Sequence, residues 1–393
     1  MIKEQISYPW FGLGFLSCSI YIIFYLNIPN RNIIINLLKA IIFVMPFCYM
    51  ILFKVKKPPQ EVMILFILYM FMLISFLTGV ILEKGVFRDI FFANTIFCIG
   101  YLFTNCQSFS VMRDSLFFGI ILSLILGGIL DLNAYIGGYS IWEEMSFVGG
   151  LGNPSSYGLL CNLSIAWLLF SNFSINRISI TPKFSLVILL SFLSIMSFSL
   201  FATFNLILVF MFFISQSPFR VTAKVFLVFI LLVAVIFLMT EISLPDVQPI
   251  FQFLLHKLMG FADFLGFVDY ETDAASVSVR LGVHERAVYI FNDQWVSMLL
   301  GHPYFISYDK NDSQILTYAL SFGIPLMIIF MLLNLRFLYL AFHMREKFYF
   351  VFFTSFLLIF ATNRILDYFP IALIYFLMVV AMTNSFKVKR MML

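Results

Sequence analysis

The chain has 393 residues, of which 62% are hydrophobic and 11% are charged, and its formal net charge is +4. Soluble globular domains carry about 25% charged residues, so this composition, with a mean hydropathy of +1.01, excludes an ordinary soluble domain. The apolar residues come in runs of about 17–22, the length of a helix that crosses a bilayer core. We therefore predict an all-α, polytopic membrane protein.

Short polar clusters divide the chain into about 12 predicted transmembrane helices. The opening sequence MIKEQISYPW lacks the apolar core and cleavage site of a signal peptide, so the first span is expected to direct its own insertion. The predicted spans are 11–28, 33–53, 62–82, 90–106, 115–136, 155–172, 184–198, 201–215, 222–240, 314–335, 348–362 and 368–384.

The stretch 184–215 has to be assigned to one helix or to two. As one helix it would be about 48 Å long, longer than the roughly 30 Å core of a bilayer. Cations flank it on both sides, with Lys183 before and Arg220 after, and short-loop cations favour the cytoplasmic side. We therefore predict two short spans with a turn near SFSLFAT. The resulting topology has both termini in the cytoplasm and places other short-loop cations, such as Arg113 and Lys347, on that side.

The same topology divides the chain into three parts. Residues 1–240 are the predicted N-terminal transmembrane bundle, 241–313 a large periplasmic loop with amphipathic helices, and 314–393 the C-terminal transmembrane helices. The loop holds ten of the 20 acidic residues, and long ordered loops are usually functional. Two helices are predicted in it, at 247–266 and 276–291.

Polar residues inside the apolar spans are few. Asp131 lies in the predicted span 115–136, and an acid at such a place is either functional or paired. We expect it to be hydrogen-bonded and structural. The five cysteines lie in or beside apolar spans without a CxxC pair, so neither a disulfide framework nor a metal site is expected.

The loop helix SVSVRLGVHERAVYIF concentrates polar residues in an otherwise apolar chain. With an N-cap at Ser276 or Ser278, Arg280 lies in the first turn, where free N–H groups and the helix dipole favour an anion. His284 lies beside the apolar face of this helix and Arg286 on its flank. A guanidinium at this place can bind phosphate oxygens with two hydrogen bonds. The alternative is that it packs its stem and pairs with a nearby acid.

This helix and the sequence after it resemble the O-antigen ligase/polymerase superfamily, especially the O-antigen polymerase (Wzy) family. In that superfamily an arginine-bearing helix of the outer loop precedes a glycine turn, here 301–303, and a polar pair at a fixed spacing from a glycine opens the next span. Asp312 and Ser313 with Gly323 match that spacing in NDSQILTYALSFGIPL. GGLGNPSSYGLL, with Asn153, resembles the family's earlier outer loop. The ligase branch has histidine in place of Asp312, which favours the polymerase.

The resemblance implies a GT-C-like glycosyltransferase of the bacterial inner membrane. Such an enzyme joins oligosaccharide repeat units carried on undecaprenyl diphosphate at the periplasmic face, for O-antigen or a similar surface glycan. The partners are then the lipid-linked donor and acceptor, with a chain-length regulator and a flippase of the same pathway as further candidates, and no nucleic acid. A diphosphate is already a good leaving group, so no metal or other cofactor is expected.

Two alternatives stay open. The first is the ligase of the same superfamily, which moves finished glycan to the lipid A core. The second is a secondary transporter or flippase for lipid-linked glycans. Transporters usually show repeated halves and broken spans at matching positions, and no internal repeat is evident in the sequence.

The residues expected to carry the chemistry lie near the outer ends of spans or in the loop. The acceptor hydroxyl has a high pKa, so a general base that takes its proton would accelerate the reaction. Asp312 is the candidate base. The alternative is that Asp312 is the N-cap of the next helix. Many family members carry an arginine in the turn between the paired short spans. The corresponding turn of this chain, SFSLFAT, has no arginine, and we expect Arg364 or Arg88 to replace it. The predicted catalytic residues are Asp312, Arg280 and His284, and the predicted substrate-binding residues are Arg286, Asn153, Glu143, Glu144, Arg364 and Arg88.

Overall fold

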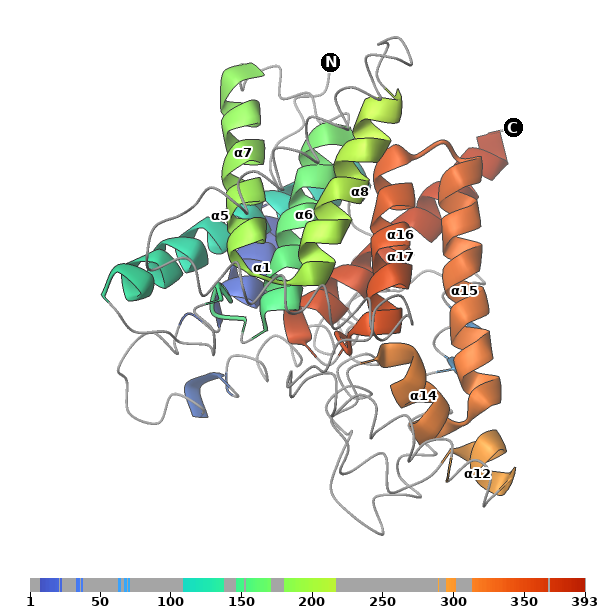
Figure 1. Ribbon diagram of the computed structural model, residues 1–393. Coiled ribbons are helices and arrows are strands. Elements are labelled where there is room, and N and C mark those ends of the chain that lie inside the picture. Colours follow the sequence, from blue (N-terminus) through green and yellow to red (C-terminus); the bar gives the residue numbers. More distant parts are fainter. Residues whose placement is uncertain are drawn as a thin grey trace.

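The computed structural model confirms the all-α prediction for the part of the chain that it describes (Figure 1). Every regular element among these residues is a helix. Ser110–Ile136 and Ile324–His343 are, by length and composition, apolar enough to cross a membrane, and shorter apolar helices of 10–17 residues accompany them. The total of about 12 spans stays a prediction. The described residues are 8–20, 22, 33–35, 37, 63–64, 67–68, 70, 109–137, 146–151, 153–170, 180–216, 289, 295–301, 313–366 and 368–392.

The prediction of two helices within 184–215 is confirmed. Helix α7 (Ile180–Met196) and helix α8 (Leu200–Gln216) run in opposite directions beside each other (Figure 1). The chain reverses at Phe198, whose φ of 48° interrupts the helical backbone. Ser199 then begins the second helix, because its Oγ accepts a hydrogen bond of 3.3 Å from a backbone N–H in the first turn.

The prediction of one continuous span over 314–335 is wrong. The chain forms helix α14 (Gln314–Phe322) and helix α15 (Ile324–His343), which are separated at Gly323. Gly323 has a φ of 88°, and a Cβ at this position would overlap the carbonyl oxygen of Leu299, in the short helix α12 (Trp295–Leu300). Glycine meets both requirements.

The C-terminal helices form an aromatic core. Helix α16 (Lys347–Thr362) packs against helix α17 (Phe369–Met392), whose residues 370–383 are buried. The ring of Tyr375 lies 5.0 Å from that of Phe356, centroid to centroid. Its hydroxyl donates a 2.7 Å hydrogen bond to Asn334 of α15, so the polar tip of this buried tyrosine is satisfied.

Two helices approach each other closely through glycines. Helix α1 (Tyr8–Ser19) crosses helix α5 (Phe109–Ile136), and a Cβ on Gly14 would overlap the carbonyl oxygen of Leu116. Gly119 meets the backbone of α1 in the same way. Small residues that let helix backbones touch are typical of helix packing in membranes.

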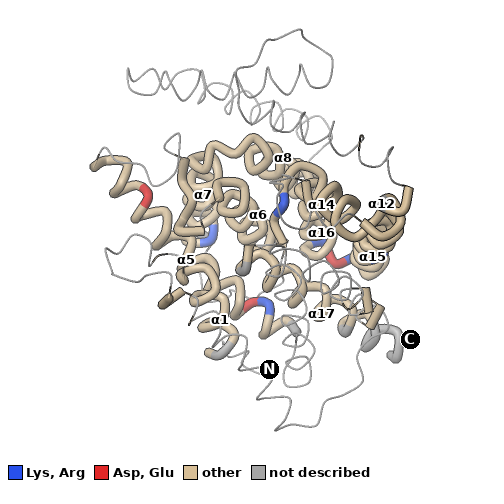
Figure 2. Tube along the Cα trace, turned by 90° about the horizontal axis from the view of Figure 1, so that it is seen from below, with Lys and Arg blue, Asp and Glu red and all other residues tan. Residues whose placement is uncertain are grey.

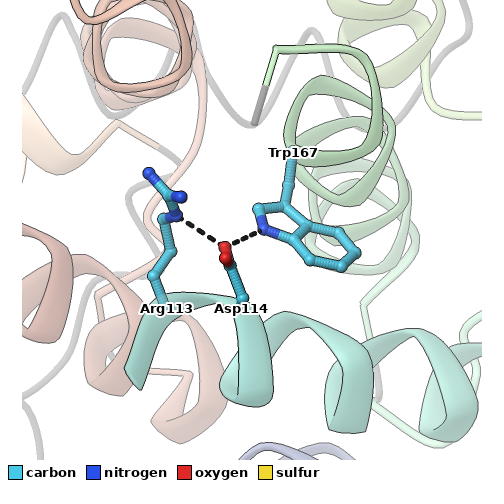
Figure 3. A network of polar contacts seen from close by, with 3 residues as sticks. All are labelled: Arg113, Asp114 and Trp167. Atoms are coloured by element: carbon cyan, nitrogen blue, oxygen red, sulfur yellow. Dashed lines mark hydrogen bonds and ion pairs between the residues drawn. The ribbon is translucent and has the colours of Figure 1, made fainter. Parts of the chain in front are cut away.

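Charged residues interrupt the described helices at only a few places (Figure 2). One is a buried network in which Arg113 Nε and Trp167 Nε1 donate hydrogen bonds of 2.9 and 2.8 Å to the same oxygen, Oδ1 of Asp114 (Figure 3). The guanidinium of Arg113 also lies 5.6 Å from the ring centroid of Phe348. The network joins the start of α5 to the end of helix α6 (Pro154–Phe170) and the start of α16.

Candidate functional site

Three helices begin at the same end of the bundle, the lower end in Figure 1: α6, α8 and α14. Each has a side-chain cap, namely Asn153, Ser199 and Ser313. The cap oxygen accepts a hydrogen bond of 3.1 to 3.3 Å from a backbone N–H of the first turn. A helix N-terminus carries about half a positive charge. These three ends lie beside the C-terminal ends of α7 and α16, which carry the opposite partial charge, so the preference of this end of the bundle for an anion depends on the full positive charge of Arg364.

Hydrogen bonds between side chains join these helix starts. Ser155 Oγ of α6 lies 2.9 Å from Ser199 Oγ at the start of α8. Asn153 Nδ2 donates a 3.0 Å hydrogen bond to the hydroxyl of Tyr368 in the segment that links α16 to α17. Since Asn153 also caps α6 with its Oδ1, both ends of its amide are used.

The same linking segment is attached to the start of α14. Oε1 of Gln314 accepts hydrogen bonds of 3.0 Å from the backbone N–H groups of Ile365 and Leu366. Ser313 Oγ donates a 3.2 Å hydrogen bond to the carbonyl oxygen at the end of α16, that of Phe360. The half-buried Arg364 lies between these contacts in sequence. We call the following set the helix-end junction: Asn153, Ser155, Ser199, Ser313, Gln314, Arg364 and Tyr368.

A buried acid holds the loop that leads into α6. Oδ2 of Asp131 accepts hydrogen bonds of 2.9 Å from Val148 N and 2.6 Å from Gly149 N. Gly149 has a φ of 53°, and residues 146–151 are buried. The expected structural, hydrogen-bonded role of Asp131 is therefore confirmed. By fixing this loop, the carboxylate also fixes the approach of the chain to Asn153.

Two of the predicted site residues, Asn153 and Arg364, lie among the described residues. Asn153 donates a hydrogen bond to Tyr368, which lies four residues after Arg364 in the sequence. The alternative role of Asp312 as the N-cap of the next helix is wrong, because Ser313 is the cap. Outside the described residues lie Arg280, His284, Arg286, Asp312, Glu143, Glu144, Arg88, the predicted helix 247–266 and most of 276–291.

Four junction residues were not found from the sequence: Ser155, Ser199, Gln314 and Tyr368. Ser199 had a usable signal, because a serine directly before an apolar helical run is a typical N-cap. Gln314 offered a weaker signal, an amide in the first turn of an apolar span. Tyr368 offered none, since its partner Asn153 is 215 residues away.

The chain matches no family model, and no curated protein and no solved structure is significantly similar to it. Within the described ranges, no group of three or more His, Cys, Asp or Glu side chains is arranged to hold a metal ion. Within the helix-end junction, Gln314 and Ser199 are buried, whereas Arg364, Asn153 and Tyr368 are half-buried. A guanidinium, an amide and a hydroxyl are chemically suited to phosphate oxygens and sugar hydroxyls.

Proposed function

We propose that this chain is a polymerase-type glycosyltransferase of the bacterial inner membrane. It joins oligosaccharide repeats carried on undecaprenyl diphosphate at the outer face of that membrane. The observation that carries this proposal is the helix-end junction, where three capped helix N-termini and Arg364 meet at one end of the bundle. Helix dipoles and a guanidinium attract the diphosphate of such a donor, and the sequence resemblance supplies the reaction class.

The proposed topology has about 12 spans, both termini in the cytoplasm and a GT-C-like arrangement. Its support is the distribution of the short-loop cations and the two apolar helices long enough to cross a membrane, Ser110–Ile136 and Ile324–His343. With Arg113 assigned to the cytoplasmic side, the loop held by Asp131 and the helix-end junction are assigned to the outer side.

The proposed reaction uses groups on both sides of the start of α14. Arg364 and the helix N–H groups hold the diphosphate, with Arg280, His284 and Arg286 of the large loop as further contacts. Asp312, which directly precedes the cap Ser313 in the chain, takes the proton of the acceptor hydroxyl. That oxygen bonds to the anomeric carbon of the donor sugar as the bond from this carbon to the diphosphate breaks. Undecaprenyl diphosphate leaves.

Four outer-side residues complete the proposed substrate contacts. Asn153 donates one N–H of its amide to Tyr368 and caps α6 with its Oδ1, so the second N–H of Nδ2 is the group assigned to the substrate. Glu143 and Glu144 precede that loop in the sequence and are assigned to sugar hydroxyls, and Arg88 to a second phosphate contact. Carboxylates accept hydrogen bonds from hydroxyl groups, and arginine donates to phosphate oxygens, so these assignments follow the chemistry of the side chains.

The test uses the purified full-length protein in lipid nanodiscs and a synthetic undecaprenyl-diphosphate oligosaccharide, without added metal, with products separated as a gel ladder. The wild type is expected to produce a ladder, and Arg280→Ala and Asp312→Ala to lose it. Arg364→Gln should slow product formation about tenfold or more, because a hydrogen bond to a charged group contributes about 1.5–3 kcal/mol. The matched control is Arg336→Gln, which changes an exposed arginine in α15 whose guanidinium lies over Tyr339.

Each of the other outcomes has a clear meaning. Absence of a ladder with a cognate repeat unit refutes the polymerase. Transfer of finished glycan to lipid A core would indicate the ligase instead, and movement of the lipid-linked glycan across the bilayer without new bonds would indicate a transporter. A ladder that persists in Asp312→Ala assigns the base to another residue.

A further inference from the structure

We propose that Gln314 is a positioning residue for Arg364. Its buried amide fixes the backbone directly after Arg364 to the first turn of α14, and so sets where the guanidinium lies relative to the three helix N-termini. The choice of a lipid diphosphate as the ligand of Arg364 rests on the proposed function above. The attachment of the Arg364 segment to Gln314 rests only on hydrogen bonds within the chain.

The first step is the geometry of the amide. Gln314 Oε1 accepts two hydrogen bonds, each of 3.0 Å, from the consecutive N–H groups of Ile365 and Leu366. Two donors directed at one atom identify that atom as the oxygen, since the amide nitrogen cannot accept a hydrogen bond. The orientation of the amide is therefore determined, and Nε2 has to point away from the segment.

The second step is burial. Gln314 has an exposed fraction of 0%, and its Nε2 is buried without a hydrogen-bond partner. An unsatisfied buried donor is unfavourable for folding, and an apolar side chain of similar size avoids this cost. Stability alone does not favour glutamine at this position. The two bonds made by its oxygen give it a specific task, which is to hold the segment that carries Arg364.

The third step is the position of α14 in the chain. Its cap Ser313 holds the carbonyl oxygen of Phe360, before Arg364, and the next residue, Gln314, holds the two N–H groups after it. The arginine segment is thus fixed on both sides by neighbouring residues of one helix start.

The attachment is tested by hydrogen–deuterium exchange of the full-length protein in nanodiscs. Gln314→Met removes the acceptor and keeps the side-chain length, so the amides of residues 363–368 should exchange about tenfold faster or more, as expected for the loss of two net hydrogen bonds. Gln314→Glu keeps an acceptor oxygen and should exchange like the wild type. The control Asn334→Leu removes an equally buried amide with bonds of 2.9 and 2.7 Å and should leave this segment unchanged.

The consequence for Arg364 is tested by binding of undecaprenyl diphosphate, with undecaprenol as the uncharged reference lipid. Gln314→Met should weaken binding of the diphosphate about tenfold, and should have no further effect in the Arg364→Gln background, because both changes remove the same contact.

Two results would overturn the inference: unchanged exchange at 363–368 in Gln314→Met, or a full additional loss of binding when this change is combined with Arg364→Gln. A wild type that binds undecaprenyl diphosphate no better than undecaprenol refutes the proposed function instead. In that case the exchange measurement still decides whether Gln314 holds the segment.

Discussion

Replacement of Asp114 by alanine removes the centre of the buried network between α5, α6 and α16. Its Oδ1 accepts from Arg113 Nε at 2.9 Å and from Trp167 Nε1 at 2.8 Å, and the residue is only 2% exposed. The change deprives two buried donors of this acceptor and leaves the guanidinium without its salt-bridge partner. Removing one partner of a buried ion pair costs about 3–5 kcal/mol of unfolding free energy. We expect a loss of this size.

The measurement is equilibrium unfolding in mixed micelles, followed by tryptophan fluorescence. Trp167 is a local reporter because its ring stacks on Phe117, with centroids 5.8 Å apart and an interplanar angle of 12°. Asp114→Ala keeps the cation of Arg113, so the change removes only the acceptor at the centre of the network. The informative comparison is the double variant Arg113→Met/Asp114→Leu, which buries no unpaired charge and should be more stable than Asp114→Ala.

Two results would refute this reasoning. A loss below about 1 kcal/mol in Asp114→Ala would place the pair among solvent-exposed salt bridges, which contribute that little. A double variant less stable than the single one would show that the network stabilises the fold by more than it costs to bury.

Three other changes should have effects that follow from the packing. Gly14→Ala should lower the unfolding free energy by about 1–3 kcal/mol, because its Cβ would overlap the Leu116 carbonyl oxygen. The control Gly12→Ala should be neutral or stabilising, because no atom lies within 4 Å of the added Cβ. Equal effects of the two changes would contradict the close crossing of α1 and α5. Gly323→Ala should cost about 1–3 kcal/mol in the same assay, because its φ is 88°. Asp131→Ala should accelerate amide exchange in the loop before α6, and unchanged protection there would contradict its structural role.

Local sequence signals predicted the helices better than the contacts between them. The helix pair around SFSLFAT followed from the length of the apolar stretch and its flanking cations. The break at Gly323 was missed because apolar residues continue on both sides, and its cause, the approach of Leu299 to the glycine, is a contact between separate elements. Only Asp312 was considered as the cap of this helix from the sequence, because aspartate is a typical N-cap residue, whereas the structure assigns the cap to Ser313.

In the candidate site, too, local sequence signals predicted individual residues but not the contacts between them. Asn153 and Arg364 were predicted from a family-like motif and from cations near span ends, and both belong to the helix-end junction. The bonds that unite them are long-range: Gln314 and Leu366 are 52 residues apart, and Asn153 and Tyr368 are 215 apart. A single sequence carries no signal for such pairs, since side-chain periodicity reports only which face of one helix is apolar.

The span of 215 residues between Asn153 and Tyr368 has a consequence for biosynthesis. Ribosomes add about 5–20 residues per second, so at these rates α6 would wait about 10–40 s before its partner tyrosine is made. During that interval its capped start and nearby serines have no segment 363–368 to contact. A nascent chain, or one truncated before Tyr368, therefore lacks the hydrogen bond from Asn153, and the helix-end junction is complete only after residue 368 has been made.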